Sequence, residues 1–157
     1  MKKLYGQFTE DEKEMINTIL HGINTKSVRI TFHAKSRMKE KDISFTDLFG
    51  VFTNYQIIEL HEKDGDVRVL LRGKRRDTLG RNTCCSYSVS SNTIITTYKN
   101  SFTDKHYTLD CNNYIDVDVS KLLKPYSFIR LFIIKSFPLA LFPIKQTTLL
   151  KNNHPFH

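Results

Sequence analysis

The 157-residue chain lacks the features of several common protein classes. Its three cysteines, Cys84, Cys85 and Cys111, are too few for a disulfide framework. Cys84 and Cys85 are adjacent in a predicted strand, so they point to opposite faces and cannot easily form a disulfide with each other. No cysteine or histidine spacing predicts a zinc site, and no nucleotide-binding or serine-hydrolase motif is present. The charged N-terminus is not followed by the apolar run of a signal peptide. We therefore expect a cytoplasmic protein with reduced thiols and with no metal or other cofactor.

Acidic residues are missing from the C-terminal part of the chain. Residues 121–157 contain 6 Lys and Arg and no Asp or Glu, whereas residues 1–120 contain 18 basic and 16 acidic residues. The net charge of +8 therefore comes mostly from the tail, and it does not by itself indicate a nucleic-acid-binding domain. One basic cluster remains outside the tail, opposed only by Asp77: Arg72, Lys74, Arg75, Arg76 and Arg81.

The tail also lacks a hydrophobic run that could cross a membrane. Residues 128–144 are mostly apolar, but they include two basic residues and two prolines, and a spanning helix needs about 20 apolar residues. Three alternatives stay open for this segment: an interfacial basic segment, a docked or disordered extension, or a tail outside the evolved domain. Membrane contact is the alternative that we favour least.

The spacing of apolar residues predicts helices in the first third of the chain. Thr9 and Glu12 are typical of a capping box, and the helix that follows ends near Gly22. Residues 27–32 alternate like a short strand, which leads directly into a helix from His33 to about Asp42. A further helix begins at the predicted cap Ser44, three residues before an acidic Asp47.

The pattern then changes to that of strands. Residues 55–61 and 67–72 flank Asp64-Gly65, a strong signal for a type I′ hairpin, and residues 83–89 and 93–99 form a second hairpin. In the first hairpin we expect Leu60 opposite Val69, Ile58 opposite Leu71 and His61 opposite Arg68. Residues 73–82 are predicted to be a basic loop, and residues 105–109 either a short strand or a loop.

Helices followed by hairpins predict an α+β fold, with N-terminal helices packed on a mostly antiparallel four-stranded meander. We divide the chain into an N-terminal helix over residues 1–25, an α+β core domain over residues 26–110 and a basic, apolar extension over residues 111–157.

The segment from Thr31 to Lys41 holds the most informative side chains. On the predicted helix His33, Arg37 and Lys41 are spaced i, i+4, i+8 and share one stripe. A histidine titrates near neutrality, so His33 suits an acid or base of metal-independent RNA cleavage, and Arg37 suits the charge that develops on phosphate. Candidates for the second proton transfer are Tyr98 and His106. The candidate phosphate-binding residues are Lys41, Arg68, Arg72, Arg75, Arg76 and Lys99.

Structural interpretations of the same residues stay open. His33 could equally be a packing or capping residue, because the N-terminus of a helix disfavours a charged imidazole. The basic segment 72–81 could equally be a solvated loop instead of a phosphate contact. For His61 and Arg68 we favour an ordinary cross-strand pair at the surface.

The motif His33-Ala34-x-x-Arg37-Met38-x-x-Lys41-x-Ile43-Ser44 follows the strand Val28-Arg29-Ile30-Thr31. It resembles the domain of unknown function 4258 family, which typically opens with Thr-x-His-Ala-x-x-Arg-Met-x-x-Arg-x-Ile-Ser. The resemblance covers about residues 26–100. Lys41 stands where the family commonly has Arg, which keeps the charge but loses the bidentate fork. The resemblance implies a small domain of mobile elements and phages, similar to the RelE and colicin-type toxin folds, and it implies no activity.

We therefore hypothesise an RNA-acting, toxin-like domain that is a metal-independent endoribonuclease. RNA, the ribosome, a cognate antitoxin or a host protein are its candidate partners. The alternative is a non-enzymatic phage or mobile-element protein that binds a host protein or nucleic acid.

Overall fold

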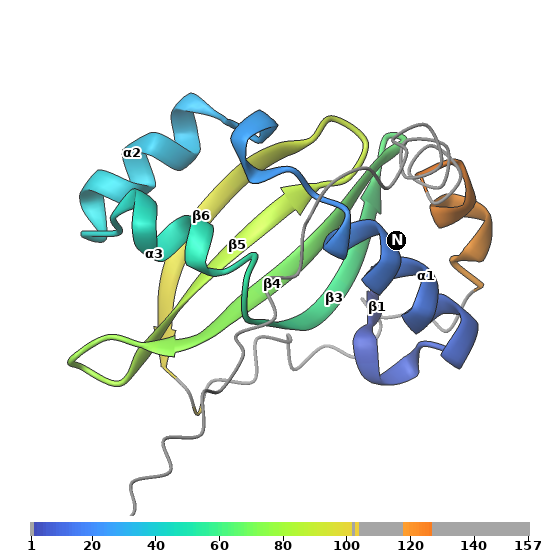
Figure 1. The fold of residues 1–157 in the computed structure, drawn as a ribbon, viewed down its shortest axis with the longest axis horizontal. Helices are drawn as coiled ribbons and strands as arrows, with labels where there is room; N and C mark the ends of the chain where they lie inside the picture. The colour runs from blue at the N-terminus through green and yellow to red at the C-terminus, as the bar shows by residue number, and fades with distance from the viewer. Residues whose placement is uncertain (1, 102, 104–117, 127–157) are drawn as a thin grey trace, which may run out of the picture.

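A six-stranded sheet forms the centre of the protein in the computed structural model, which describes residues 2–101, 103 and 118–126. The strand order is β1-β3-β4-β5-β6-β2 (Figure 1). The strands are β1 (Lys2–Leu4), β2 (Arg29–Ile30), β3 (Tyr55–Lys63), β4 (Asp66–Arg76), β5 (Arg81–Ser88) and β6 (Thr93–Ser101). Strands β3 to β6 form an antiparallel meander, β1 pairs antiparallel with β3, and β2 pairs parallel with β6.

The predicted α+β class is confirmed, but the prediction of four strands is wrong: the sheet has six strands and is mixed, because β2 pairs parallel with β6. The meander is present, and a short strand is added at each of its edges. β1 has only 3 residues and was not predicted. β2 has 2 residues and lies within the strand predicted over residues 27–32, but its place beside β6 was not predicted. Backbone hydrogen bonds from Arg29 N–H to Asn92 O and from Thr31 N–H to Ile94 O hold β2 on β6. These partners are far apart in the sequence, so only the tertiary fold reveals the pairing.

The helices begin at side chains that cap their free N–H groups. They are α1 (Glu10–His21), α2 (Phe32–Glu40) and α3 (Phe45–Gly50), with short 3-10 turns at Tyr5–Gln7 and Thr25–Ser27 and helical residues at 120–126. Thr9 Oγ1 accepts from Glu12 N–H while Glu12 Oε2 accepts from Thr9 N–H, which confirms the predicted capping box. Ser44 begins α3 as predicted. Thr31 Oγ1 accepts from Ala34 N–H, so α2 begins one residue before His33.

The first hairpin has the predicted turn. Asp64 and Gly65 have φ angles of 54° and 78°, as the two central residues of a type I′ turn require. Leu60 pairs with Val69 and His61 with Arg68, as predicted. Further along, Ile57 and not Ile58 lies opposite Leu71, because the register shifts between Ile57 and Glu59.

The basic segment 73–82 is mostly strand and not the predicted loop. β4 continues to Arg76 and β5 begins at Arg81, so the basic residues of this segment lie on a β4–β5 hairpin. Asp77 Oδ1 accepts from the N–H groups of Leu79 and Arg81 at 3.0 and 2.9 Å, and Gly80 takes a φ angle of 72°. The Asp77 side chain therefore closes the turn together with two backbone bonds, from Asp77 N–H to Arg81 O at 2.8 Å and from Gly80 N–H to Asp77 O at 3.0 Å.

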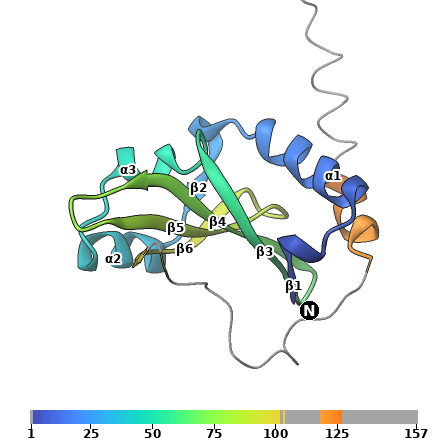
Figure 2. The ribbon, with the colours of Figure 1, turned by 90° about the horizontal axis from the view of Figure 1, so that it is seen from below.

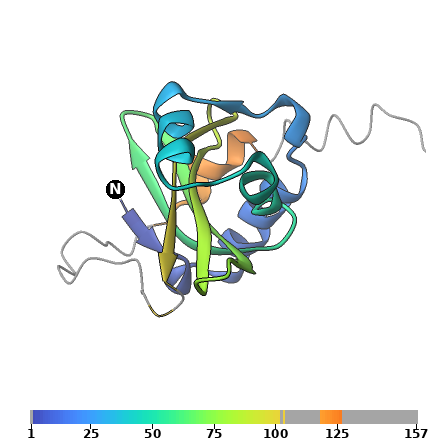
Figure 3. The same cartoon turned by 90° about the vertical axis from the view of Figure 1, so that its left-hand side faces the viewer.

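One cluster of buried apolar side chains joins the helices to the sheet. α1 and α3 lie over the same side of the sheet at its two ends, and α2 packs along β6 (Figures 2 and 3). Fully buried members of the cluster include Ile16, Ile19, Ala34, Leu48, Leu60, Val69, Leu71, Tyr87, Ile94 and Leu123. The cluster thus extends from α1 through the sheet to the helical residues 120–126.

A buried carboxylate ties the N-terminal elements to residues 118–126. Glu12 and Lys3 are 0% and 1% exposed, and Lys3 Nζ lies 3.1 and 3.0 Å from the two carboxylate oxygens of Glu12. Thr9 N–H and Val119 N–H also donate to this carboxylate, at 2.8 and 2.7 Å. Burial alone would raise the pKa of Glu12, but the hydrogen bonds from Val119, Thr9 and Lys3 outweigh it and lower the pKa. We call Lys3, Thr9, Glu12 and Val119 the Glu12 junction.

Several predicted features lie outside the described residues. They are His106, Cys111, residues 105–109 and the apolar segment 128–144. Within residues 2–101, 103 and 118–126, no helix is both long enough and apolar enough to cross a membrane.

Candidate functional site

The structure places the predicted site residues in three separate locations, the first of which is α2. Here His33 is exposed, and Arg37 and Lys41 both face Glu40. The nearest approaches to the Glu40 carboxylate are 2.7 Å from Arg37 and 3.1 Å from Lys41. The hydrogen bond from Lys41 and those from Arg37 lower the pKa of Glu40, which stays ionised. The two cations of the stripe are thus engaged with a carboxylate of the same helix.

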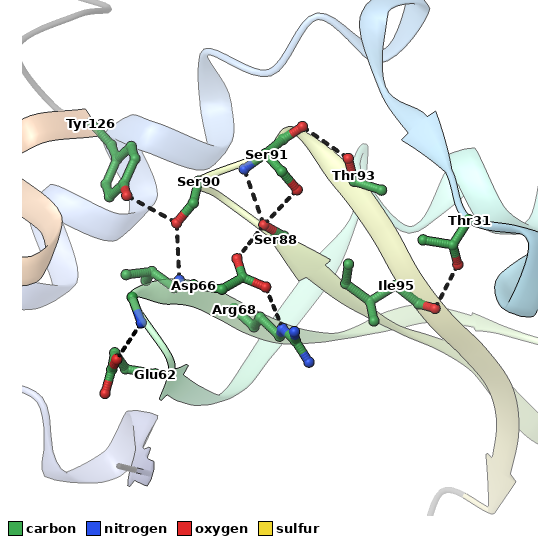
Figure 4. A network of polar contacts seen from close by, with 12 residues as sticks. Thr31, Glu62, Asp66, Arg68, Ser88, Ser90, Ser91, Thr93, Ile95 and Tyr126 are labelled. Atoms are coloured by element: carbon green, nitrogen blue, oxygen red, sulfur yellow. Dashed lines mark hydrogen bonds and ion pairs between the residues drawn. The ribbon is translucent and has the colours of Figure 1, made fainter.

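The second location is the sheet face that carries Arg68, Arg72 and Tyr98. The register aligns Arg72 with Cys84 and Cys84 with Tyr98, so these side chains share a face. Arg68 Nε donates to Asp66 Oδ2 at 2.6 Å, and Ser88 Oγ donates to the other oxygen of Asp66 (Figure 4). Burial raises the pKa of Tyr98, so its phenol keeps its proton at neutral pH and is not a base.

The polar network around Asp66 shows how this face is held together. Ser88 Oγ accepts from the N–H and the hydroxyl of Ser91, and Val67 N–H donates to Ser90 Oγ (Figure 4). Ser90 also bonds the Tyr126 hydroxyl at 2.9 Å, which connects the β5–β6 turn to the helical residues 120–126. Arg68 is therefore part of a structural network at the start of β4.

The third location brings Arg75, Arg76 and Lys99 together around a cleft of about 560 Å³. The β4–β5 hairpin projects from the end of the sheet near which α3 lies (Figures 1 and 2), and the cleft lies between them. Its wall also contains two carboxylates, four threonines and an amide: Asp47, Asp77, Thr46, Thr53, Thr78, Thr83 and Asn54. We call these residues, with the three cations, the basic cleft.

The position of Gly73 in β4 lets α3 close one side of the basic cleft. A Cβ atom at Gly73 would lie 3.2 Å from Val51 Cγ2 and 3.3 Å from Thr83 O, closer than ordinary van der Waals contact, so glycine favours this approach. Gly73 lies within the stretch between Arg72 and Arg76 where the register of β4 and β5 shifts. Asn82 Nδ2 donates to Gly73 O and Arg75 O at 2.8 and 3.3 Å, which supports this irregular stretch of β4.

Both carboxylates of the basic cleft are ionised and engaged with the fold. The backbone N–H of Arg81 lowers the pKa of Asp77 most, and the Arg81 guanidinium, Leu79 N–H and Lys99 lower it further. The Ser44 hydroxyl and N–H lower the pKa of Asp47, to which the charges of Lys99 and Arg75 add. Neither carboxylate is therefore a ready general base at neutral pH.

The cations of the basic cleft differ in their partners. Lys99 Nζ lies 3.4 Å from Asp77 Oδ2, and its side chain is only 10% exposed. Arg75 is exposed, and its guanidinium makes no hydrogen bond or ion pair with any residue that the structure describes. Because a guanidinium presents a fork of donors that matches two phosphate oxygens, Arg75 and Lys99 can hold an anion between hydroxyl-bearing side chains.

Several predicted site residues do not line the cleft, and some that do were missed. His33, Arg37 and Tyr98 are absent from its described lining, and Tyr98 points to the opposite face from its neighbour Lys99. Asp47 was predicted only as part of a helix cap, and nothing in the spacing placed it near the hairpin. Among the described residues, no group of three or more His, Cys, Asp or Glu side chains could hold a metal ion.

Comparison with known proteins identifies a family match. Residues 30–99 match the model of a family described as Domain of unknown function (DUF4258). No curated protein and no solved structure matches the chain. The matched range begins at the end of β2 and runs into β6, and it contains every residue that lines the basic cleft. The Glu12 junction lies outside it.

Proposed function

We propose, for a chain whose residues 30–99 belong to the DUF4258 family of domains of unknown function, that the basic cleft binds single-stranded RNA through its phosphates. One observation carries the proposal: Arg75, Arg76 and Lys99, predicted separately as phosphate-binding residues, line one cleft. It corresponds to the alternative hypothesis drawn from the sequence, a non-enzymatic protein that binds nucleic acid.

The charge and size of the cleft support a single strand. Around the cleft the three cations Arg75, Arg76 and Lys99 outnumber the carboxylates Asp47 and Asp77, and Asp77 is engaged in the turn. A volume of about 560 Å³ is that of a small-ligand site, which takes a nucleotide or two and not a duplex. The threonine hydroxyls and the Asn54 amide around the cations are groups that can bond a ribose 2′-hydroxyl.

The test is the salt dependence of RNA binding by the full chain. Fluorescence anisotropy with a labelled single-stranded RNA would be measured over a series of salt concentrations for the wild type and for Arg75→Ala with Arg76→Ala. Each lost phosphate contact lowers the slope of log affinity against log salt by about 0.7, so the double variant is expected to lose about 1.4.

The matched control removes the same charge elsewhere. Lys26 and Lys63 are exposed and do not line the cleft, so Lys26→Ala with Lys63→Ala is expected to keep the wild-type slope. Equal losses in the two double variants would contradict a site at the cleft, because they would show only a nonspecific effect of net charge. Equal affinity for single-stranded DNA of the same sequence would remove the role of the 2′-hydroxyl.

Cleavage of the bound strand stays a separate prediction, with His33 as its acid or base. It would be tested by incubating tRNA, mRNA and ribosomes with the protein in the presence of EDTA. Cleavage by the wild type that is lost in His33→Ala would support an endoribonuclease. Binding without cleavage, unaffected by His33→Ala, would leave the binding function alone. Three further predictions rest on the sequence and on its resemblance to the DUF4258 family. They are a toxin role with a cognate antitoxin, a mobile-element origin and a cytoplasmic location.

A further inference from the structure

We propose that α2 and the start of α3 form a docking surface for an acidic segment of a partner protein that carries apolar side chains. This surface is separate from the basic cleft. The first observation is exposed aromatic area: Phe32 is 86% and Phe45 58% exposed. A ring of this size buries a large apolar area when it is covered, and aromatic residues are enriched in protein interfaces.

Two lysines lie along the same side of α2 as Phe32. Phe32, Lys35 and Lys39 are spaced i, i+3, i+7, which places them on one stripe about 10 Å long. Neither lysine forms an ion pair or a side-chain hydrogen bond with a residue among those described, whereas Arg37 and Lys41 are engaged with Glu40. Lys35 and Lys39 are therefore the cations of α2 that are available to a partner.

The stripe ends at a shallow groove between α2 and α3. The groove has a volume of about 420 Å³ and is lined by Lys35, Met38, Lys39, Asp42, Ile43, Ser44 and Phe45. Its floor is apolar, because Met38 and Ile43 are 6% and 5% exposed and belong to the core cluster. The Phe45 ring stacks on Phe49 with 6.4 Å between centroids, so it forms one wall of the groove in a defined position.

The chemistry of the groove favours a protein segment over nucleic acid. A methionine and an isoleucine at the floor offer no hydrogen-bond donors to a phosphate, and methionine adapts well to apolar partners. The rim carries two lysines and one carboxylate, Asp42, so its net charge is positive and it attracts acidic side chains. The whole surface is complemented by a segment of one kind. It would place an apolar side chain in the groove, acidic residues beside Lys35 and Lys39, and an apolar side chain against Phe32.

The test uses the isotope-labelled full chain and synthetic peptides, with amide chemical shifts as the readout. A peptide of Leu-Glu-Glu repeats is expected to shift amides within residues 32–45. Peptides of Leu-Lys-Lys or Ser-Glu-Glu repeats are expected to leave them unchanged, because the first reverses the charge and the second removes the apolar side chains. Equal shifts with all three peptides, or no shifts with the first, would overturn the proposal.

Variants separate this surface from the rest of the molecule. Phe45→Ser, and Lys35→Glu with Lys39→Glu, are each expected to weaken binding of the Leu-Glu-Glu peptide by about tenfold or more. Leu79→Ser is the matched control, since Leu79 is 72% exposed on the β4–β5 turn and outside the groove. Phe45→Ser should bind single-stranded RNA like the wild type. RNA that shifts the amides of residues 32–45, in competition with the peptide, would instead make this surface a nucleic-acid site and overturn the proposal.

Discussion

The Glu12 junction and the basic cleft are both places where lysine or arginine meets a carboxylate, and they differ in their access to water. In the junction Lys3 and Glu12 are fully buried, and four donor–acceptor contacts satisfy the carboxylate. In the basic cleft Lys99 is largely buried, but Arg75 and Arg76 are exposed. The junction lies outside the residues that match the family, and the cleft lies inside them.

This difference separates charge that holds the fold from charge that is available to a ligand. A buried ion pair is costly to break, because removing one partner leaves an uncompensated charge away from water. Around the cleft, Asp77 is used to order the hairpin and Asp47 to cap α3, so the exposed arginines contribute little to either. We therefore expect substitutions in the junction to change stability and substitutions in the cleft to change binding.

The largest effect is expected from Glu12→Gln. The amide would remove the negative charge that pairs with the buried Lys3 and would turn an N–H donor toward Thr9 N–H or Val119 N–H. The free energy of unfolding should fall by about 3–5 kcal/mol, measured by urea denaturation. Glu14 is exposed on the same helix, and Glu14→Gln should stay within about 0.5 kcal/mol of the wild type. Similar losses in both variants would show that the junction does not differ from a surface charge.

The pH dependence of stability should show part of the same effect. The pKa of Glu12 lies below its usual value of 4.5 in the folded chain, so the unfolded chain binds the proton first as the pH falls. The stability advantage of the wild type over Glu12→Gln is therefore full above about pH 4.5 and shrinks as the pH falls through the folded pKa. Denaturation curves of the two proteins at several pH values would measure this. An advantage that does not change with pH would contradict a lowered pKa.

Gly73→Ala should change both stability and RNA binding, because the substitution strains the fold at the wall of the basic cleft. The added methyl group would lie 3.2 Å from Val51 Cγ2 and 3.3 Å from the backbone oxygen of Thr83, so these neighbours would have to shift by a few tenths of an ångström. A loss of about 1–3 kcal/mol in unfolding free energy is expected, together with weaker RNA binding. Gly50 has nothing within 4 Å of the corresponding position, so Gly50→Ala should keep or slightly raise stability. A neutral Gly73→Ala would mean that α3 does not pack this closely on β4.

The smallest stability effect is expected from Arg75→Ala with Arg76→Ala. Exposed cations contribute little to folding, so the unfolding free energy should change by less than about 0.5 kcal/mol while the salt slope of RNA binding changes clearly. Thermal or urea denaturation of the sample used for binding would measure both properties together. A large loss of stability would remove the distinction between the cleft and the Glu12 junction.

Features that depend on neighbouring residues could be predicted from the sequence. The caps at Thr9 and Ser44 and the type I′ turn at Asp64-Gly65 each need only a few consecutive side chains. The engagement of Arg37 with Glu40, three residues further on, was also visible in the spacing, but the prediction considered only the cations of the stripe. The shift between Ile57 and Glu59 could not be predicted, since a bulge depends on how the strand fits its neighbours.

The sequence alone determined the α+β class, the cap residues and the order of helices and hairpins, because local hydrogen bonds and the period of apolar residues specify these features. Only the tertiary structure decided which basic residues meet. Arg75 and Lys99 come from different strands, and the cleft depends on α3 closing over Gly73. Pairing across the sheet brought Lys99 to the cleft and turned Tyr98 away from it, since successive residues of a strand point to opposite faces.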